Sequence, residues 1–396
     1  MTKWFGESNN LYMGEKEVQL ILVDILYSVL NSSKDTVSVC KNITPDILSA
    51  VYRLAKKHDL AHIVSNYVYH NSIEVSPEIR DKLQNEEIIS VYRYEQMKYA
   101  YDEICGVFDE QGIAYIPLKG AVIRPYYPVE SMRTSCDIDI LIHESDLEVA
   151  IKCLKAKGYS CGKKAYHDIS LYSSNNIHLE LHFNIQENMG FLDEVLKDAW
   201  DYAVLEQGSR YAFKKEFFVF HVYAHMAYHF LSGGCGIRFL MDLWIMEHKM
   251  EAPFTCAETL LKKAGIYKFA TKISKLANNC FSSNVRDEFS DLLLNYLFKG
   301  GIYGSKENSI AFQKSSKNST FIYAVKRLFL PYKLMVIAYP VLKKAPYLLP
   351  FCWVNRWCKA IFGGKTKSII KEINCANKIT NQKTEEIKTL QKWLGL

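Results

Sequence analysis

The stretch that decides the fold is IPLKGAVIRPYYPVESMRTSCDIDILIHESDL, from Ile116 to Leu147. Near its end, two acids, Asp137 and Asp139, alternate with isoleucines in a strand-like segment. Alternate residues of a strand project from the same face, so both carboxylates point the same way. Two such carboxylates repel each other, and one takes up a proton unless a cation lies between them. These residues alone indicate either a metal site or a pair of acids on a solvated strand edge.

A second predicted strand, NIHLELHFNI over residues 176–185, carries a third carboxylate. Glu180 lies at its centre, with His178 and His182 on the same face. If this strand neighbours the first, three carboxylates converge as in a two-metal phosphoryl-transfer site. Glu180 is then a shared metal ligand that also helps to deprotonate the nucleophile. Mg²⁺ suits such a site, with Mn²⁺ as the alternative, because hard cations prefer oxygen ligands.

The turn PLKGAVIRPYY upstream of the acids supplies candidate phosphate contacts. Lys119 and Gly120 lie between a strand and a predicted short helix. Glycine permits close approach of the backbone, and a helix N-terminus offers N–H groups to phosphate. Arg124 and Arg133 are further candidates, and Ser135 is a donor for a phosphate oxygen. The GxxxxGK[ST] spacing of a P-loop is absent.

The surrounding pattern predicts an α+β fold with a small mixed β-sheet flanked by N-terminal and C-terminal helical regions. Thr44 is a predicted helix N-cap, followed by Pro45. Strands are expected at 113–118, 136–143, 167–173 and 176–185. The expected division is 1–95, an N-terminal helical region; 96–205, the sheet-containing core; 206–305, a helical region; and 306–396, a basic aromatic tail containing prolines.

The order LKG, RTSCDID, a helix ending in Gly-Tyr and LELH resembles the nucleotidyltransferases of the DNA polymerase beta-like superfamily. More narrowly, it resembles a bacterial family of uncharacterised nucleotidyltransferases. The resemblance makes 96–205 the catalytic core and implies that Asp137, Asp139 and Glu180 bind the metals and catalyse the reaction. Gly120 matches the turn glycine of the superfamily.

Lys119-Gly120 replaces the usual Gly-Ser pair, a form shared with the narrower family and with nucleotidyltransferase-like toxins. The resemblance implies that Lys119, Gly120, Arg133 and Ser135 hold the triphosphate of an NTP. It implies a Mg²⁺-dependent enzyme that transfers a nucleoside monophosphate to an unknown acceptor and releases pyrophosphate. Two alternatives remain open: a nucleotide-binding or interaction module without turnover, and a toxin-like transferase that acts on RNA or protein.

Several histidines offer a competing metal site. His221, His225 and His229 recur every four residues on one predicted helix, which is a spacing found in zinc sites. The H-E-x-x-H motif is absent, so we interpret them as a polar stripe on a helix that packs against the core. The pair His167-Asp168 lies in a short strand without the other ligands of a metal-dependent phosphohydrolase.

The composition favours a cytoplasmic protein. We expect no signal peptide, reduced thiols from 11 cysteines without a CxxC pair, and no span of the roughly 20 apolar residues that cross a bilayer.

Residues 300–319 read as a linker or long loop. Residues 321–396 hold 14 Lys/Arg and 3 Asp/Glu. We expect this basic tail to pack as a helical subdomain; peripheral contact with an anionic membrane is second, and nucleic acid is less favoured.

Overall fold

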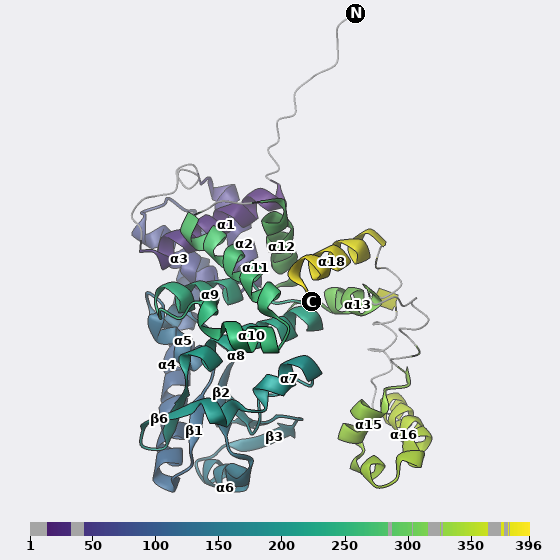
Figure 1. Cartoon of the computed structure of the whole chain (residues 1–396). Coiled ribbons are helices and arrows are strands. Elements are labelled where there is room, and N and C mark those ends of the chain that lie inside the picture. The colour runs from purple at the N-terminus through teal and green to yellow at the C-terminus, as the bar shows by residue number, and fades with distance from the viewer. Residues whose placement is uncertain are drawn as a thin grey trace, which may run out of the picture.

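The computed structural model describes residues 14–32, 43–283, 287–302, 304–315, 325, 328–362, 374–375, 379 and 381–396. A seven-stranded mixed sheet lies in the lower half of Figure 1, and helices cover both of its faces. This arrangement confirms the predicted α+β class.

The sheet has the strand order β3-β4-β5-β2-β1-β7-β6. The β2–β5 and β1–β7 pairs are parallel and the other neighbours are antiparallel. The strands are β1 (Tyr115–Pro117), β2 (Asp137–Ile142), β3 (Ser160–Lys164), β4 (Asp168–Tyr172), β5 (His178–His182), β6 (Ala203–Gln207) and β7 (Arg210–Phe213).

The described helices precede, interrupt and follow the sheet. Those before or within it are α1 (Glu15–Leu30), α2 (Pro45–Lys57), α3 (Ala61–His70), α4 (Pro77–Gln111), α5 (Gly120–Ile123), α6 (Leu147–Ala156) and α7 (Gly190–Leu196). Those after it are α8 (Lys215–Ser232), α9 (Arg238–His248), α10 (Glu258–Lys263), α11 (Tyr267–Asn278), α12 (Glu288–Gly300), α13 (Lys306–Ser315), α15 (Tyr332–Ala338), α16 (Leu349–Phe362) and α18 (Asn381–Leu394).

The alternation of β2 divides its side chains between two apolar cores. Ile138, Ile140 and Ile142 pack with residues of α4 and α6 on one face of the sheet. Leu141 joins the larger core on the other face, which includes α1, α8, α9 and α11. Asp137, Asp139 and Leu141 are alternate residues of β2 and therefore project from the same face of the sheet. The two acids thus face the side that α8 covers.

The helical region before the sheet begins as its capping residues predict. The Thr44 side chain accepts a hydrogen bond from the N–H of Ile47, and Pro45 opens α2. The structure then ends α2 at Lys57 and starts α3 at Ala61, with Asp59 between them at φ 56°. This left-handed residue separates α2 from α3.

Two features differ from the sequence expectations. Strands β3, β6 and β7 enlarge the expected four-stranded sheet; their partly or fully exposed side chains give a weak alternation signal. The loop expected over 300–319 is wrong for Lys306–Ser315, which form α13. The Ser305 hydroxyl accepts from the N–H of Asn308, and Ile310 is buried, so a cap and an apolar anchor stabilise this helix. Residues 316–319 lie outside the described part.

Helices α15 and α16 of the basic tail form a small core of their own beside the main body (Figure 1). Helix α18 instead packs into the main core through Ile387, Leu390 and Leu394. Met335, Leu342 and Cys352 are buried where α15 meets α16. In the described residues, no helix combines the length and apolarity that a membrane crossing requires.

Candidate active site

The register of the two central parallel strands brings the three predicted acids together. Asp139 of β2 pairs with Glu180 of β5, and Asp137 pairs with His178. The expectation that these strands are neighbours is therefore confirmed. All of these side chains are half-buried, on the side of the sheet covered by α8.

Two overlapping groups of ligand atoms result from this register. One consists of Asp137, His178 and Glu180, and the other of Asp139, Glu180 and His182. Within each group the donor atoms lie within 4.8 Å of one another. Glu180 belongs to both groups, as expected of a carboxylate shared by two cations.

The electrostatics of the acids reflect surplus negative charge. Burial would raise the pKa of Asp139, but Lys119 and His182 outweigh it and hold the pKa below its usual range. Burial and the neighbouring Asp139 raise the pKa of Asp137. Burial and the two aspartates raise the pKa of Glu180 to about 7. A divalent cation would relieve this repulsion, so the donor set fits Mg²⁺.

Lys119 and His182 are the immediate partners of Asp139. The Lys119 Nζ lies 3.4 Å from Asp139 Oδ1, and His182 Nε2 lies 3.0 Å from the same oxygen. Lys119 adopts φ 41°, a left-handed conformation that turns the chain sharply between β1 and α5.

The turn offers less to an anion than its sequence indicates. The N–H groups of Ala121 and Val122 donate to the carbonyls of Leu118 and Lys119. Helix α5 is only four residues long. The backbone of this turn is thus largely occupied within the protein, and the Lys119 side chain is the cation nearest the acids.

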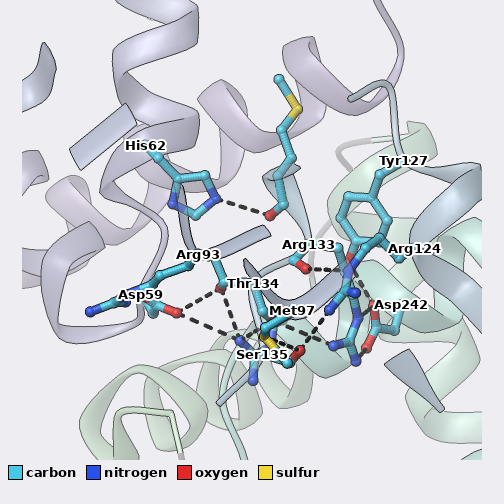
Figure 2. A network of polar contacts seen from close by, with 12 residues as sticks. Asp59, His62, Arg93, Met97, Arg124, Tyr127, Arg133, Thr134, Ser135 and Asp242 are labelled. Carbon is cyan, nitrogen blue, oxygen red and sulfur yellow. Dashed lines mark hydrogen bonds and ion pairs between the residues drawn. The ribbon is translucent and has the colours of Figure 1, made fainter. Parts of the chain in front are cut away.

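Gly120 has a packing role that the sequence did not reveal. A Cβ at this position would lie 2.5 Å from Nη1 of Arg133. The Arg133 guanidinium is buried and pairs with Asp242 of α9 through Nε at 3.2 Å and Nη2 at 2.8 Å (Figure 2). The Tyr127 hydroxyl donates to the same carboxylate at 2.7 Å. Gly120 therefore leaves space for a buried ion pair.

Arg124 and Ser135 form a second linked pair in Figure 2. Arg124 donates to the carbonyl of Arg133 at 3.1 Å and to the Ser135 hydroxyl at 2.6 Å. Its guanidinium lies over the ring of Tyr94, 5.9 Å from the centroid. Burial and neighbouring Arg133 lower the pKa of Arg124 to about 10.

Residues 132–134, which precede β2, form hydrogen bonds with residues of distant parts of the chain. Thr134 donates to Asp59 at 2.6 Å, and Arg238 of α9 donates to the Thr134 carbonyl at 2.8 Å. His62 of α3 bonds the carbonyl of Met132 at 2.9 Å (Figure 2). These bonds fix the residues that lead into Asp137.

A cavity of about 450 Å³ lies against the acids. Asp137, Asp139 and Glu180 line it together with Gly120 and Ser135. Its cationic lining comes from six side chains: Lys98, Lys119, Arg124, Arg133, Arg210 and Arg238. All the predicted site residues therefore border one space, and Lys98, Arg210 and Arg238 are additions that sequence spacing did not indicate.

Two of the three histidines of α8, His225 and His229, also line this cavity. His225 Nδ1 lies 3.0 Å from Glu187 Oε1, and His225 Nε2 lies 3.0 Å from His229 Nε2. In the described residues, the ligand groups do not include His221, His225 or His229. Glu187, which follows β5, was not anticipated; its one sequence signal is an acid five residues after the end of LELH.

A comparison with protein families identifies the family to which this chain belongs. A family model described as uncharacterised nucleotidyltransferase matches residues 47–282, more than half of the chain. The chain belongs to this nucleotidyltransferase family, which makes a nucleoside triphosphate its implied substrate. A search of curated proteins and a search of solved structures found no match. The matched segment includes the three acids, the cavity lining and α8.

Proposed function

We propose that the protein is a Mg²⁺-dependent transferase that moves a nucleoside monophosphate from an NTP to an acceptor hydroxyl. The observation that carries this proposal is the register of β2 and β5, which places three carboxylates beside a cation-lined cavity. A cavity of about 450 Å³ lies within the roughly 300–1,000 Å³ of ligand pockets.

Asp137, Asp139 and Glu180 hold the metal in this proposal. Mg²⁺, when bound, supplies neutralisation of charge on the reacting phosphate and the leaving pyrophosphate. The pKa of Glu180, raised to about 7, supports this assignment because it marks a carboxylate that requires a proton or a cation at neutral pH. Lys119 adds a fixed positive charge next to Asp139.

The triphosphate lies along the cationic wall of the cavity. Lys119 is a direct contact, and Ser135 is presented to the cavity by its bond from Arg124. Arg133 has its Nε and Nη2 engaged with Asp242, so its main contributions are positive potential and the position of the Gly120 turn.

The proposed transfer is a displacement of pyrophosphate at the α-phosphorus of the NTP. The acceptor oxygen forms a bond to the α-phosphorus, and the bond from that phosphorus to the bridging oxygen of the β-phosphate breaks. Pyrophosphate leaves with the bonding electrons, and Glu180 takes the hydroxyl proton.

The test combines calorimetry with a pyrophosphate-release assay on the full chain. Wild-type protein is mixed with Mg²⁺ and each of the NTPs in the presence of cell extract. We expect binding and release by wild type, and binding without release by Asp139→Asn. Equal release by both proteins contradicts the proposal, and binding without release by wild type favours a nucleotide-binding module.

A further inference from the structure

A second, smaller cavity adjoins the acid cluster. It has a volume of about 140 Å³ and shares Lys119, Glu180, His225 and His229 with the larger cavity. This volume is close to the roughly 150 Å³ of an engineered cavity that holds benzene. A single ring-sized group therefore fits inside it.

The lining of the small cavity is dominated by imidazoles. His182 comes from β5, His167 lies in the turn just before β4, and His221, His225 and His229 come from α8. Burial lowers the pKa of His221 to about 3 and of His229 to about 4, and the pKa of His225 also falls well below its usual range. These three rings are neutral at pH 7, and a neutral imidazole both donates and accepts a hydrogen bond.

Two histidines of this lining each have a buried nitrogen atom without a hydrogen-bond partner. Nδ1 of His221 and Nδ1 of His182 make no hydrogen bond in the described part of the chain. Both residues are more than nine-tenths buried. His182 Nε2 bonds the Asp139 carboxylate, which only accepts, so Nε2 is the donor of this ring. A buried polar atom without a partner is costly, and a ligand hydroxyl would satisfy it.

The charges around this cavity disfavour an anionic occupant. Lys119 is its one cationic side chain among the described residues, and Asp139 already engages it. Glu180 and Glu187 add negative charge on the same wall. The larger cavity has six cationic and six acidic side chains, but three of those acids form the proposed metal site and a fourth, Asp242, is paired with Arg133. A phosphate or carboxylate is therefore better accommodated in the larger cavity.

We infer that the small cavity binds the acceptor, and that this acceptor presents an uncharged, hydroxyl-bearing group such as a sugar or polyol ring. This inference rests on the proposed transferase function. Glu180 lines both cavities, so a hydroxyl in the small cavity and a triphosphate in the larger one both border this carboxylate. That arrangement suits transfer of the hydroxyl proton to Glu180 as the oxygen attacks the α-phosphorus. The bonds formed and broken are those of the displacement given above, with the proton passing to Glu180.

The experiment uses the full chain, α-³²P-labelled NTPs, Mg²⁺ and a heat-treated cell extract divided by ion exchange into neutral and charged fractions. We expect label to enter compounds of the neutral fraction. We further expect His221→Leu to raise the amount of that fraction needed for half-maximal labelling by about tenfold, the effect of one lost hydrogen bond. NTP affinity, measured by calorimetry, stays unchanged in this variant.

His58→Leu is the matched control. His58 is also buried and also has an Nδ1 without a partner, but it lines neither cavity. We expect it to label the neutral fraction as wild type does, at equal folded concentration by circular dichroism. If His221→Leu is poorly folded, Tyr228→Phe, which removes the hydroxyl of another lining residue, is read in the same way.

Label entering only charged compounds overturns the inference, as does an unchanged dependence on the neutral fraction in the folded His221 or Tyr228 variant. Either result leaves the transferase function standing, because label is still transferred. Wild-type protein that neither binds nor consumes an NTP rejects the proposed function and the acceptor site together.

Discussion

Asp139 and Glu180 lie directly opposite each other on the adjacent parallel strands β2 and β5. This register places two carboxylates of one sheet face side by side, with Asp137 beside them. Lys119 and His182 compensate Asp139, whereas Glu180 keeps a pKa of about 7. Glu180, which both ligand groups share, is therefore less compensated by positive charge than Asp139.

The stability of the protein should depend on pH through Glu180. Its pKa of about 7 in the folded state exceeds the ordinary 4.5, so the folded protein binds more protons than the unfolded chain between these values. The free energy of unfolding therefore falls as pH rises from about 4.5 to 7 in the presence of EDTA. Excess Mg²⁺ replaces the proton, so the rise in Tm caused by Mg²⁺ should be larger at about pH 8 than at about pH 5.

Glu180→Gln separates this effect from general ionic strength. The variant should be less sensitive to pH between about 5 and 7 and gain less Tm from Mg²⁺. Thermal unfolding scans measure the pH dependence of Tm and its increase with Mg²⁺, with KCl added to the Mg²⁺-free samples to equalise the ionic strength. A Mg²⁺ response of wild-type size in the variant would show that the cation binds elsewhere.

The buried pair of Arg133 and Asp242 should be essential for folding stability. Asp242→Ala leaves the Arg133 guanidinium and the Tyr127 hydroxyl without their acceptor. We expect a loss of about 3–5 kcal/mol in urea unfolding. Glu194→Ala, which removes an exposed ion pair with Lys197, should leave the unfolding midpoint unchanged. Similar midpoints for the two variants would contradict the structural role of Asp242.

Gly120→Ala should disturb the same pair from the opposite side. The added Cβ meets Arg133 Nη1 at 2.5 Å, so the guanidinium must move away from Asp242. We expect about 1–3 kcal/mol of destabilisation and weaker NTP binding. Gly106→Ala is the control, because its Cβ in α4 meets nothing within 4 Å and should stabilise the helix by about 0.5–1 kcal/mol. Equal effects of the two changes would count against the packing role of Gly120.

We propose that membrane contact, the expectation ranked second to packing for the basic tail, occurs at an exposed surface around the start of α16. Tyr347, in the 3₁₀ turn Pro346–Leu348 just before α16, is 78% exposed, and Phe351 in the first turn of α16 is 72% exposed. Val354, which is also exposed, lies three residues after Phe351 on the same face of α16. Lys343 and Lys344 are also exposed nearby, and no acid occurs from residue 308 to 371. Apolar and aromatic side chains beside lysines favour an anionic bilayer surface.

Sedimentation with vesicles tests this contact. The protein should bind vesicles containing phosphatidylglycerol but not pure phosphatidylcholine, and the double change Tyr347→Ser and Phe351→Ser should weaken binding about tenfold or more. Tyr69→Ser removes an equally exposed aromatic from α3 and should have no effect. Equal sedimentation of all three proteins, or binding to RNA alone, would contradict the membrane prediction.

Local patterns were sufficient for much of the fold and for the central acids. Alternation in DIDIL and LELH predicted two strands and the face of each acid, and Thr44 predicted the start of α2. The four-part division of the chain stays a prediction, as do the roles of the phosphate contacts. The family match bears out the resemblance that these motifs carry.

Motif spacing in the sequence could not predict contacts between residues that lie far apart in the chain. Arg133 reads as a free phosphate contact until Asp242, 109 residues later, is placed against it. Glu187 and His225 meet only because α8 packs across the sheet. Strands β6 and β7 have little apolar alternation, and their place in the sheet depends on pairing with β1. Each of these features depends on tertiary contacts that no short sequence window contains.

The central claim is that the three acids of β2 and β5 catalyse nucleotidyl transfer. Its most direct test supplies α-³²P-labelled NTPs, Mg²⁺ and cell extract to wild-type protein and to a variant carrying Asp137→Asn and Asp139→Asn. Transfer of the label to an acceptor and release of unlabelled pyrophosphate are measured separately. We predict labelled product and pyrophosphate from wild type, and at least a roughly hundredfold loss of both in the folded variant. Identical labelling by the two proteins would contradict the account.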